Sequence, residues 1–162
     1  NRKIIFMKKL HRTSFLVIVT LLLITTGCSM KTLPTAEVNY LSGKEGTITM
    51  RAIGIGSNQE DAIVDAEKNA FNVIFFRGLP ESEQKIALIG TNETAEKEKN
   101  KDYFNKFYKD KRYKTFVMSS IPTSDLTKHK GGKKSIAIDV KINLVALRKD
   151  LEQNNIIRKF GF

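Results

Sequence analysis

Cysteine and histidine are nearly absent from this chain of 162 residues, which contains one cysteine and two histidines. The cysteine, Cys28, has no partner for an intramolecular disulfide, and His129 is the only histidine that follows it. Zinc sites are usually built from several cysteine and histidine ligands, so we expect no metal and no other cofactor. A catalytic histidine beside a nucleophile is equally hard to assemble, and we expect the protein not to be an enzyme.

A nucleotide-binding motif is also missing, although IGIGSNQEDA at residues 53–62 resembles one at first sight. A dinucleotide fingerprint needs a third glycine three residues beyond Gly56, where this chain has Gln59, and a P-loop needs a lysine before the helix. Glu60 would repel a phosphate at a helix N-terminus. We interpret the segment as structural: the glycines let a strand turn tightly, and Ser57 with Glu60 forms a capping box that starts a helix.

The apolar run at residues 15–24 is about half as long as the roughly 20 residues that a transmembrane helix needs. Basic residues precede it, and Met7 is a plausible initiator. Residues 1–27 are therefore predicted to be a secretory signal, with residues 1–6 as an upstream extension. A membrane-spanning helix is the less favoured alternative.

Cys28 follows directly on the predicted signal, in the sequence ITTGCS. Thr26, Gly27 and Cys28 resemble the bacterial lipoprotein box, in which the cysteine becomes the first mature residue and carries lipid, although Thr25 stands where an aliphatic residue is usual. We expect Cys28 to be lipidated; the alternative is ordinary cleavage that leaves a free thiol. In such lipoproteins an aspartate after the cysteine favours the inner membrane, so Ser29 implies the outer membrane, with its periplasmic face favoured.

Basic residues outnumber acidic ones, and the formal net charge is +11. Five of the 28 basic residues lie within residues 1–27, which leaves about +6 for the mature chain. This balance does not indicate a nucleic-acid partner. Lysines concentrate at residues 128–134, where Lys130 and Lys133 are candidates for contact with anionic lipid headgroups or cell-wall polymers. The alternative is a solvated hairpin tip.

After the predicted signal we expect a lipidated cysteine and a polar linker at residues 28–45, and the hydrophobic pattern predicts one α+β domain at residues 46–162. The last two predicted strands form a hairpin, so the sheet should be mostly antiparallel. Residues 86–89 are ambiguous, and residues 92–102 fit either a solvated helix or a mobile loop. The expected strands are 46–56, 113–121 and 135–144, and the expected helices are 57–77, 103–108 and 145–155.

An aromatic cluster recurs at helical spacing, at Tyr103, Phe104, Phe107 and Tyr108. Such a stripe usually packs into the core of a domain. The alternative is a groove that binds a small apolar or glycan ligand, or a partner protein.

The stretch RAIGIGS at residues 51–57, followed by Ala62, Ala66 and Ala70, resembles the N-terminal domain of flagellar assembly protein T and the small outer-membrane lipoproteins that share it. In those families a strand ending in a G-x-G turn leads into an alanine-rich helix, and an alternating strand returns near the C-terminus. The resemblance covers roughly residues 46–146. It implies a small α+β domain used for assembly or scaffolding, and it supplies no catalytic residues.

These observations favour a non-enzymatic envelope lipoprotein, anchored through Cys28, that acts as a scaffold or assembly module. Its expected partners are the outer membrane and an envelope protein, with a homo-oligomer as a further option. A carrier or sensor with an aromatic-lined groove is the alternative function. An enzyme that uses a carboxylate pair is the third.

Overall fold

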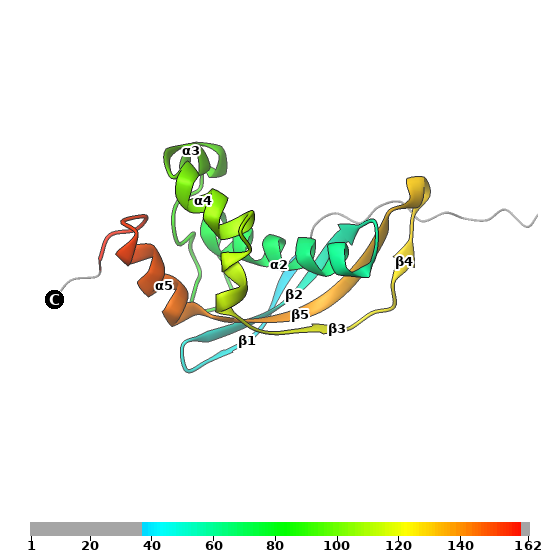
Figure 1. Cartoon of the computed structure of the whole chain (residues 1–162). Helices are drawn as coiled ribbons and strands as arrows, with labels where there is room; N and C mark the ends of the chain where they lie inside the picture. Colours follow the sequence, from blue (N-terminus) through cyan, green and yellow to red (C-terminus); the bar gives the residue numbers. More distant parts are fainter. Residues whose placement is uncertain (1–36, 160–162) are drawn as a thin grey trace, which may run out of the picture. The chain divides into compact units, whose positions relative to one another are not determined.

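Five strands form one antiparallel sheet within residues 37–159, the part of the chain that the computed structural model describes. The sheet order is β1-β2-β5-β3, and β4 also pairs with β5. The predicted α+β class is confirmed (Figure 1). The predicted signal, Cys28 and residues 160–162 lie outside the described residues. The strands are β1 (Val38–Lys44), β2 (Thr47–Gly56), β3 (Val117–Pro122), β4 (Thr127–Lys128) and β5 (Lys134–Asn143).

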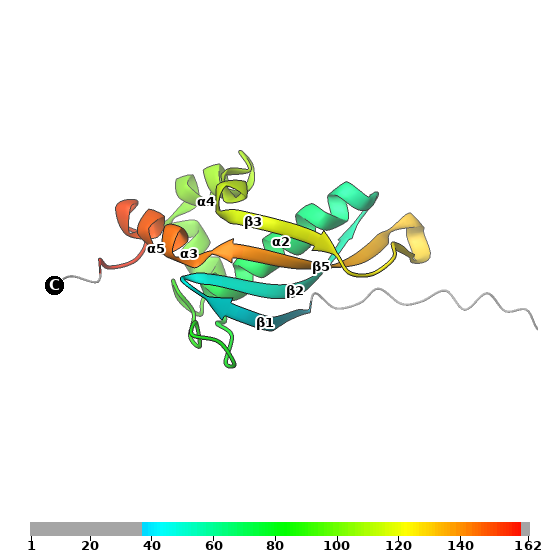
Figure 2. The same cartoon turned by 90° about the horizontal axis from the view of Figure 1, so that it is seen from below.

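The helices lie on one face of the sheet and at one end of it, and the view from below shows the opposite face uncovered (Figure 2). The longest, α2, packs across the two central strands, β2 and β5. Residues 93–99 form a helix with no buried residue, so of the two alternatives for residues 92–102 the solvated helix is correct for this part. The α-helices are α2 (Gln59–Phe76), α3 (Glu93–Lys99), α4 (Lys101–Tyr108) and α5 (Leu144–Gln153), and the short 3-10 helices are η2 (Arg112–Phe116) and η3 (Lys130–Gly132).

Close contact between α2 and β2 depends on small residues on both elements. Ala62, Ala66 and Ala70 are fully buried, as their spacing predicts. A Cβ added to Gly54 would lie 1.9 Å from the carbonyl oxygen of Ala62. A Cβ added to Gly56 would lie 2.4 Å from the amide nitrogen of Ala62. Both glycines are part of β2, and neither has a positive φ. The prediction that they form a tight turn is therefore wrong: they leave space for the helix backbone.

Asn58, not Ser57, is the residue that caps α2. The Asp61 backbone N–H donates to Asn58 Oδ1 at 2.9 Å, so the predicted capping box is wrong by one residue. Both residue types cap helices well, and sequence alone does not decide between neighbours. At the other end, Gly78 has a φ of +78°, which confirms the predicted left-handed C-terminal position.

Strand β1 lies inside residues 28–45, which we expected to form a linker. It pairs with β2 from Val38 to Lys44, so the linker prediction is wrong for these residues, and the domain begins earlier than residue 46. Val38 and Tyr40 pack against the core. The pairing register shifts between Tyr40 and Ser42, and this bulge breaks the alternation that would have indicated a strand.

The predicted strand 113–121 is only partly correct. Residues 112–116 form η2 and the strand begins at Val117, because Tyr113 and Phe116, three residues apart, both turn into the core. Residues 86–89 form neither helix nor strand; the Leu88 N–H donates to the Ile74 carbonyl near the end of α2. Strand β5 alternates as predicted, with Ile138, Val140 and Ile142 fully buried, and α5 follows it directly.

Candidate functional site

The aromatic residues of α4 belong to the core. Tyr103, Phe104 and Phe107 are at most 8% exposed, and the Phe107 ring lies 5.2 Å from that of Phe71 between centroids. The Tyr108 hydroxyl donates to Asn72 Oδ1 at 2.7 Å. None of the pockets described within residues 37–159 is lined by these four aromatic residues. The geometry therefore gives no support to an aromatic-lined ligand groove.

Tyr103 also takes part in a polar cluster that joins three helices. Its hydroxyl donates to Asp150 Oδ2 of α5 at 2.8 Å, and Arg112 of η2 pairs with the same carboxylate. The Arg112 guanidinium lies over the Tyr103 ring, 5.3 Å from its centroid. Burial, and then the hydrogen bond to Asp150, raise the pKa of Tyr103. These contacts hold α4, η2 and α5 together, and we assign the cluster a structural role.

Within residues 37–159, Glu67 of α2 is the only buried carboxylate. Ser120 Oγ donates to its Oε1 at 2.7 Å, and Lys114 Nζ lies 2.5 Å from its Oε2. Burial, and then the negative charge of Glu67, raise the pKa of the neighbouring Tyr113. The carboxylate is paired with Lys114 and enclosed by protein, which suits a structural ion pair better than an acid–base role.

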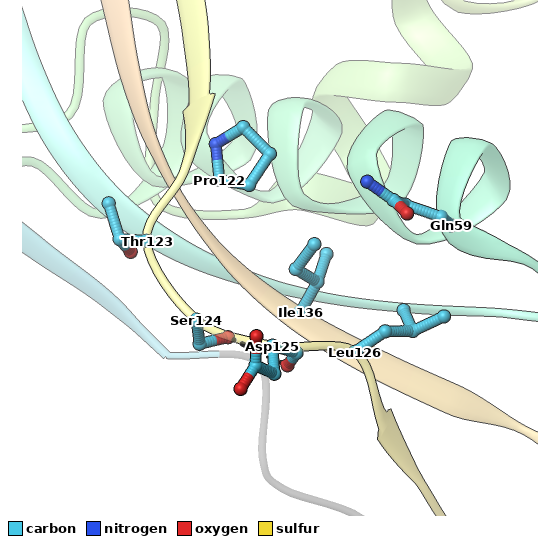
Figure 3. A pocket seen from close by; sticks show the side chains of 7 residues that line it. All are labelled: Gln59, Pro122, Thr123, Ser124, Asp125, Leu126 and Ile136. Carbon is cyan, nitrogen blue, oxygen red and sulfur yellow. Dashed lines mark hydrogen bonds between the residues drawn. The ribbon is translucent and has the colours of Figure 1, made fainter.

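A hollow of about 590 Å³ lies between the start of α2 and the segment that links β3 to β4 (Figure 3). Its wall is fixed to β5, because the Thr123 N–H donates to the Ala137 carbonyl at 2.8 Å and Ser124 Oγ accepts from the Ala137 N–H at 2.9 Å. Most of the lining side chains are exposed, so the hollow is open to solvent. It is lined by Gln59, Pro122, Thr123, Ser124, Asp125, Leu126 and Ile136.

The lining of this hollow is mixed in character. Gln59 and Asp125 supply an amide and a carboxylate, while Leu126 and the buried Ile136 supply apolar surface. Such a surface can hold a small polar ligand by hydrogen bonds. Its lining does not include the two carboxyl groups that must flank a glycosidic bond for its hydrolysis. The hollow has no signal in the sequence, because its residues come from distant segments of the chain that only the fold brings together.

The lysine-rich segment forms the tip of the hairpin between β4 and β5. Lys130 and Lys133 are both exposed, as expected for either a solvated tip or a contact site. Gly131 and Gly132 both have a φ of +77°, and no atom other than those of the adjoining residues lies within 4 Å of the position that a Cβ would occupy. His129 is buried below the tip, with its Nε2 2.7 Å from Ser135 Oγ.

The uncovered face of the sheet has a polar centre and an apolar border at β3. Arg51 and Asp139 form a two-point ion pair at the centre, with N···O distances of 2.8 and 3.0 Å. Ile121 pairs with Asp139 in the ladder between β3 and β5. Met118 and Ile121 are 55% and 59% exposed, and we call these two side chains with the outer backbone of β3 the β3 edge.

The β3 edge combines exposed apolar side chains with a strand that ends the sheet order. A terminal strand presents unpaired backbone N–H and C=O groups, to which an extended segment of another protein can pair. The strand sequence, VMSSIP, contains no charged residue that would oppose such pairing. The sequence pattern predicts a strand here but not its position at the edge, because strand order depends on contacts between distant segments.

No protein-family model, curated protein or solved structure matches the chain. The resemblance to the flagellar domain therefore stays a prediction. Within residues 37–159, no three metal-ligating side chains come together as a metal site would require. The same residues contain no helix with the length and hydropathy to cross a bilayer.

Proposed function

We propose that this protein is an envelope lipoprotein that is anchored through Cys28 and binds another envelope protein at the β3 edge. The observation that carries the proposal is the exposure of Met118 and Ile121 on an uncharged terminal strand. A strand from the partner would pair with the backbone of β3 and cover both side chains. The lipoprotein box at Cys28 supports the membrane anchor, and the solid packing of the aromatic helix favours a scaffold over a carrier.

The anchor is tested by labelling cells with palmitate. We expect the wild-type chain to incorporate the label and to fractionate with the outer membrane, whereas Cys28→Ala loses both properties. Unchanged fractionation of Cys28→Ala, with no label in the wild type, would show that the anchor is wrong.

The binding surface is tested by isolating the tagged, lipidated protein from its native envelope. The double variant Met118→Asn/Ile121→Asn removes the apolar side chains of the β3 edge, and we expect it to lose a protein that co-purifies with the wild type. Ile86→Asn is the matched control, since Ile86 is 76% exposed and lies in the loop after α2. Equal recovery of the partner with both variants would contradict the proposed surface.

A second candidate function is the binding of a small ligand in the hollow beside α2. Its volume of about 590 Å³ favours this, because small-molecule sites commonly measure about 300–1,000 Å³. A thermal-shift comparison with short glycans and peptides tests it. A ligand that stabilises the wild type, but not Gln59→Ala/Asp125→Ala, would support a carrier or sensor.

A further inference from the structure

The lysine-rich hairpin tip, residues 128–134, lies at the end of the sheet where the chain enters the domain. Strand β1 begins at Val38, which pairs with Ala52, and Ala52 pairs with Ile138 of β5. Lys134 lies four residues from Ile138 towards the tip, or about 13 Å along the strand. The tip therefore extends beyond the start of β1, whereas α3, α4 and α5 lie at the other end of the sheet (Figure 1).

The hairpin tip concentrates positive charge on an uncovered surface. None of its four lysines takes part in an ion pair between described residues. The acids around it are Asp125, three residues before Lys128, and Glu60 and Asp61 in the first turn of α2, which begins shortly after Gly56, the ladder partner of Lys134. These three negative charges are fewer than the four positive charges of the tip. The four lysines are Lys128, Lys130, Lys133 and Lys134.

Packing fixes the base of the hairpin tip and leaves its outer side open. Thr127 and Lys128 pair with β5, and His129 and Ser135 are buried in contact with each other. Apart from the adjoining residues, no atom lies within 4 Å of the position that a Cβ would take on Gly131 or Gly132. The lysines are thus held on a supported loop whose outer side no other part of the described domain covers.

The segment between Cys28 and Val38, which we call the tether, limits how far this end of the domain can be from a lipidated Cys28. Nine residues lie between Cys28 and Val38, so the ten steps of a fully extended tether reach at most about 35 Å. A lipid at Cys28 attaches one end of the chain and does not by itself orient the domain; a basic patch close to an anionic lipid surface supplies a second contact. The tip is placed where it can supply one.

We propose that the hairpin tip binds the anionic headgroups of phospholipids, and so orients the domain with α3, α4 and α5 pointing away from the membrane. This inference rests on the proposed anchor at Cys28 to bring the tip close to a membrane. The attraction between its lysines and anionic headgroups does not depend on lipidation. A membrane surface is favoured over a cell-wall polymer because the short tether keeps the tip close to the bilayer. Each lysine near an anionic surface strengthens binding about five-fold at low salt.

The test uses the full mature chain with Cys28→Ser, so that binding does not depend on lipidation. Sedimentation with phosphatidylcholine vesicles, with and without phosphatidylglycerol, measures the partition coefficient. We expect binding only to the anionic vesicles, and a loss of about 100-fold in Lys128→Gln/Lys130→Gln/Lys133→Gln. Added salt should weaken the binding, because the charges are exposed.

The matched control is Lys99→Gln/Lys106→Gln/Lys149→Gln, which removes the same charge from exposed lysines of α3, α4 and α5. We expect it to bind within about two-fold of the unsubstituted chain. Equal loss in both triple variants would mean that only net charge matters, and would overturn the proposal. So would equal binding to neutral vesicles, or no binding to anionic ones.

Two further measurements separate the remaining explanations. In the first, isolated peptidoglycan replaces the vesicles. If the tip lysines are needed for binding to peptidoglycan but not to anionic vesicles, the tip binds cell-wall polymers and the proposal is wrong. The unfolding midpoint of the tip variant should equal that of the parent chain; if it is lower, the single variants Lys130→Gln and Lys133→Gln take its place. Failure of palmitate labelling would remove the anchor but leave the vesicle result standing.

Discussion

At the scale of single residues, Gly54 decides how closely α2 can lie on the sheet. The absence of a side chain there lets the backbone around Ala62 and Ala66 approach β2 directly. The sequence showed both the glycine and the alanines, but it could not show that they face each other, because the contact joins two elements. The same limit applied to Glu67, whose partners Lys114 and Ser120 are distant in sequence.

We expect Gly54→Ala to destabilise the domain by about 3 kcal/mol or more, because the new Cβ would lie only 2.3 Å from the Ala66 backbone nitrogen and α2 would have to move. Chemical denaturation measures the free energy of unfolding. Gly90→Ala is the control, since its Cβ would meet only the flexible Glu96 side chain at 3.3 Å. Similar stability of the two variants would show that the close helix–strand contact is absent.

At the scale of elements, sequence periodicity predicted β2, α2, β5 and α5 well, because each buries one continuous face. It failed at β1, where a bulge interrupts the alternation, and at η2, where a 3-10 turn interrupts a run of β-forming residues. The candidate site was harder to predict. The sequence identified the lysines of the hairpin tip, but neither the β3 edge nor the hollow has a local signal.

The residue that caps α2 is Asn58 in the structure, one residue after the predicted cap, Ser57. We expect Asn58→Ala to cost about 1 kcal/mol, because it leaves the Asp61 N–H without its side-chain acceptor. Ser57→Ala should change the free energy of unfolding by less than about 0.5 kcal/mol. A larger loss from Ser57→Ala than from Asn58→Ala, measured by chemical denaturation, would restore the capping box centred on Ser57.

At the scale of the whole molecule, the aromatic core couples folding to pH. Burial raises the pKa of Tyr103, Tyr108 and Tyr113 above the ordinary value near 10. Their phenols thus stay protonated in the folded state after those of the unfolded chain ionise. Because the folded-state pKa is raised, this stabilisation is complete below pH 10 and is lost as the pH rises above it.

We therefore expect the free energy of unfolding to fall above about pH 10, by up to about 1.4 kcal/mol per pH unit for each of the three phenols. Denaturation at a series of pH values measures this slope, and Tyr108→Phe should reduce it. Absorbance of the phenolate should rise together with unfolding. Ionisation of all tyrosines near pH 10 in a domain that stays folded would contradict the buried aromatic core.

The domain as a whole has three distinct surfaces: the hairpin tip, the end formed by α3, α4 and α5, and the uncovered sheet face bordered by β3. In the proposed arrangement the tip faces the membrane and the β3 edge is open to the periplasm. A lipidated chain held in this way would present the same strand to a partner in every copy. The central claim is that this strand is the contact.

The most direct measurement places a photo-crosslinking amino acid at position 121 of the full-length chain in living cells, with position 86 as the control. We expect one discrete adduct with a second envelope protein from position 121 and none from position 86, since both side chains are exposed but only the first lies on the β3 edge. No adduct from position 121, or the same adducts from both positions, would contradict it.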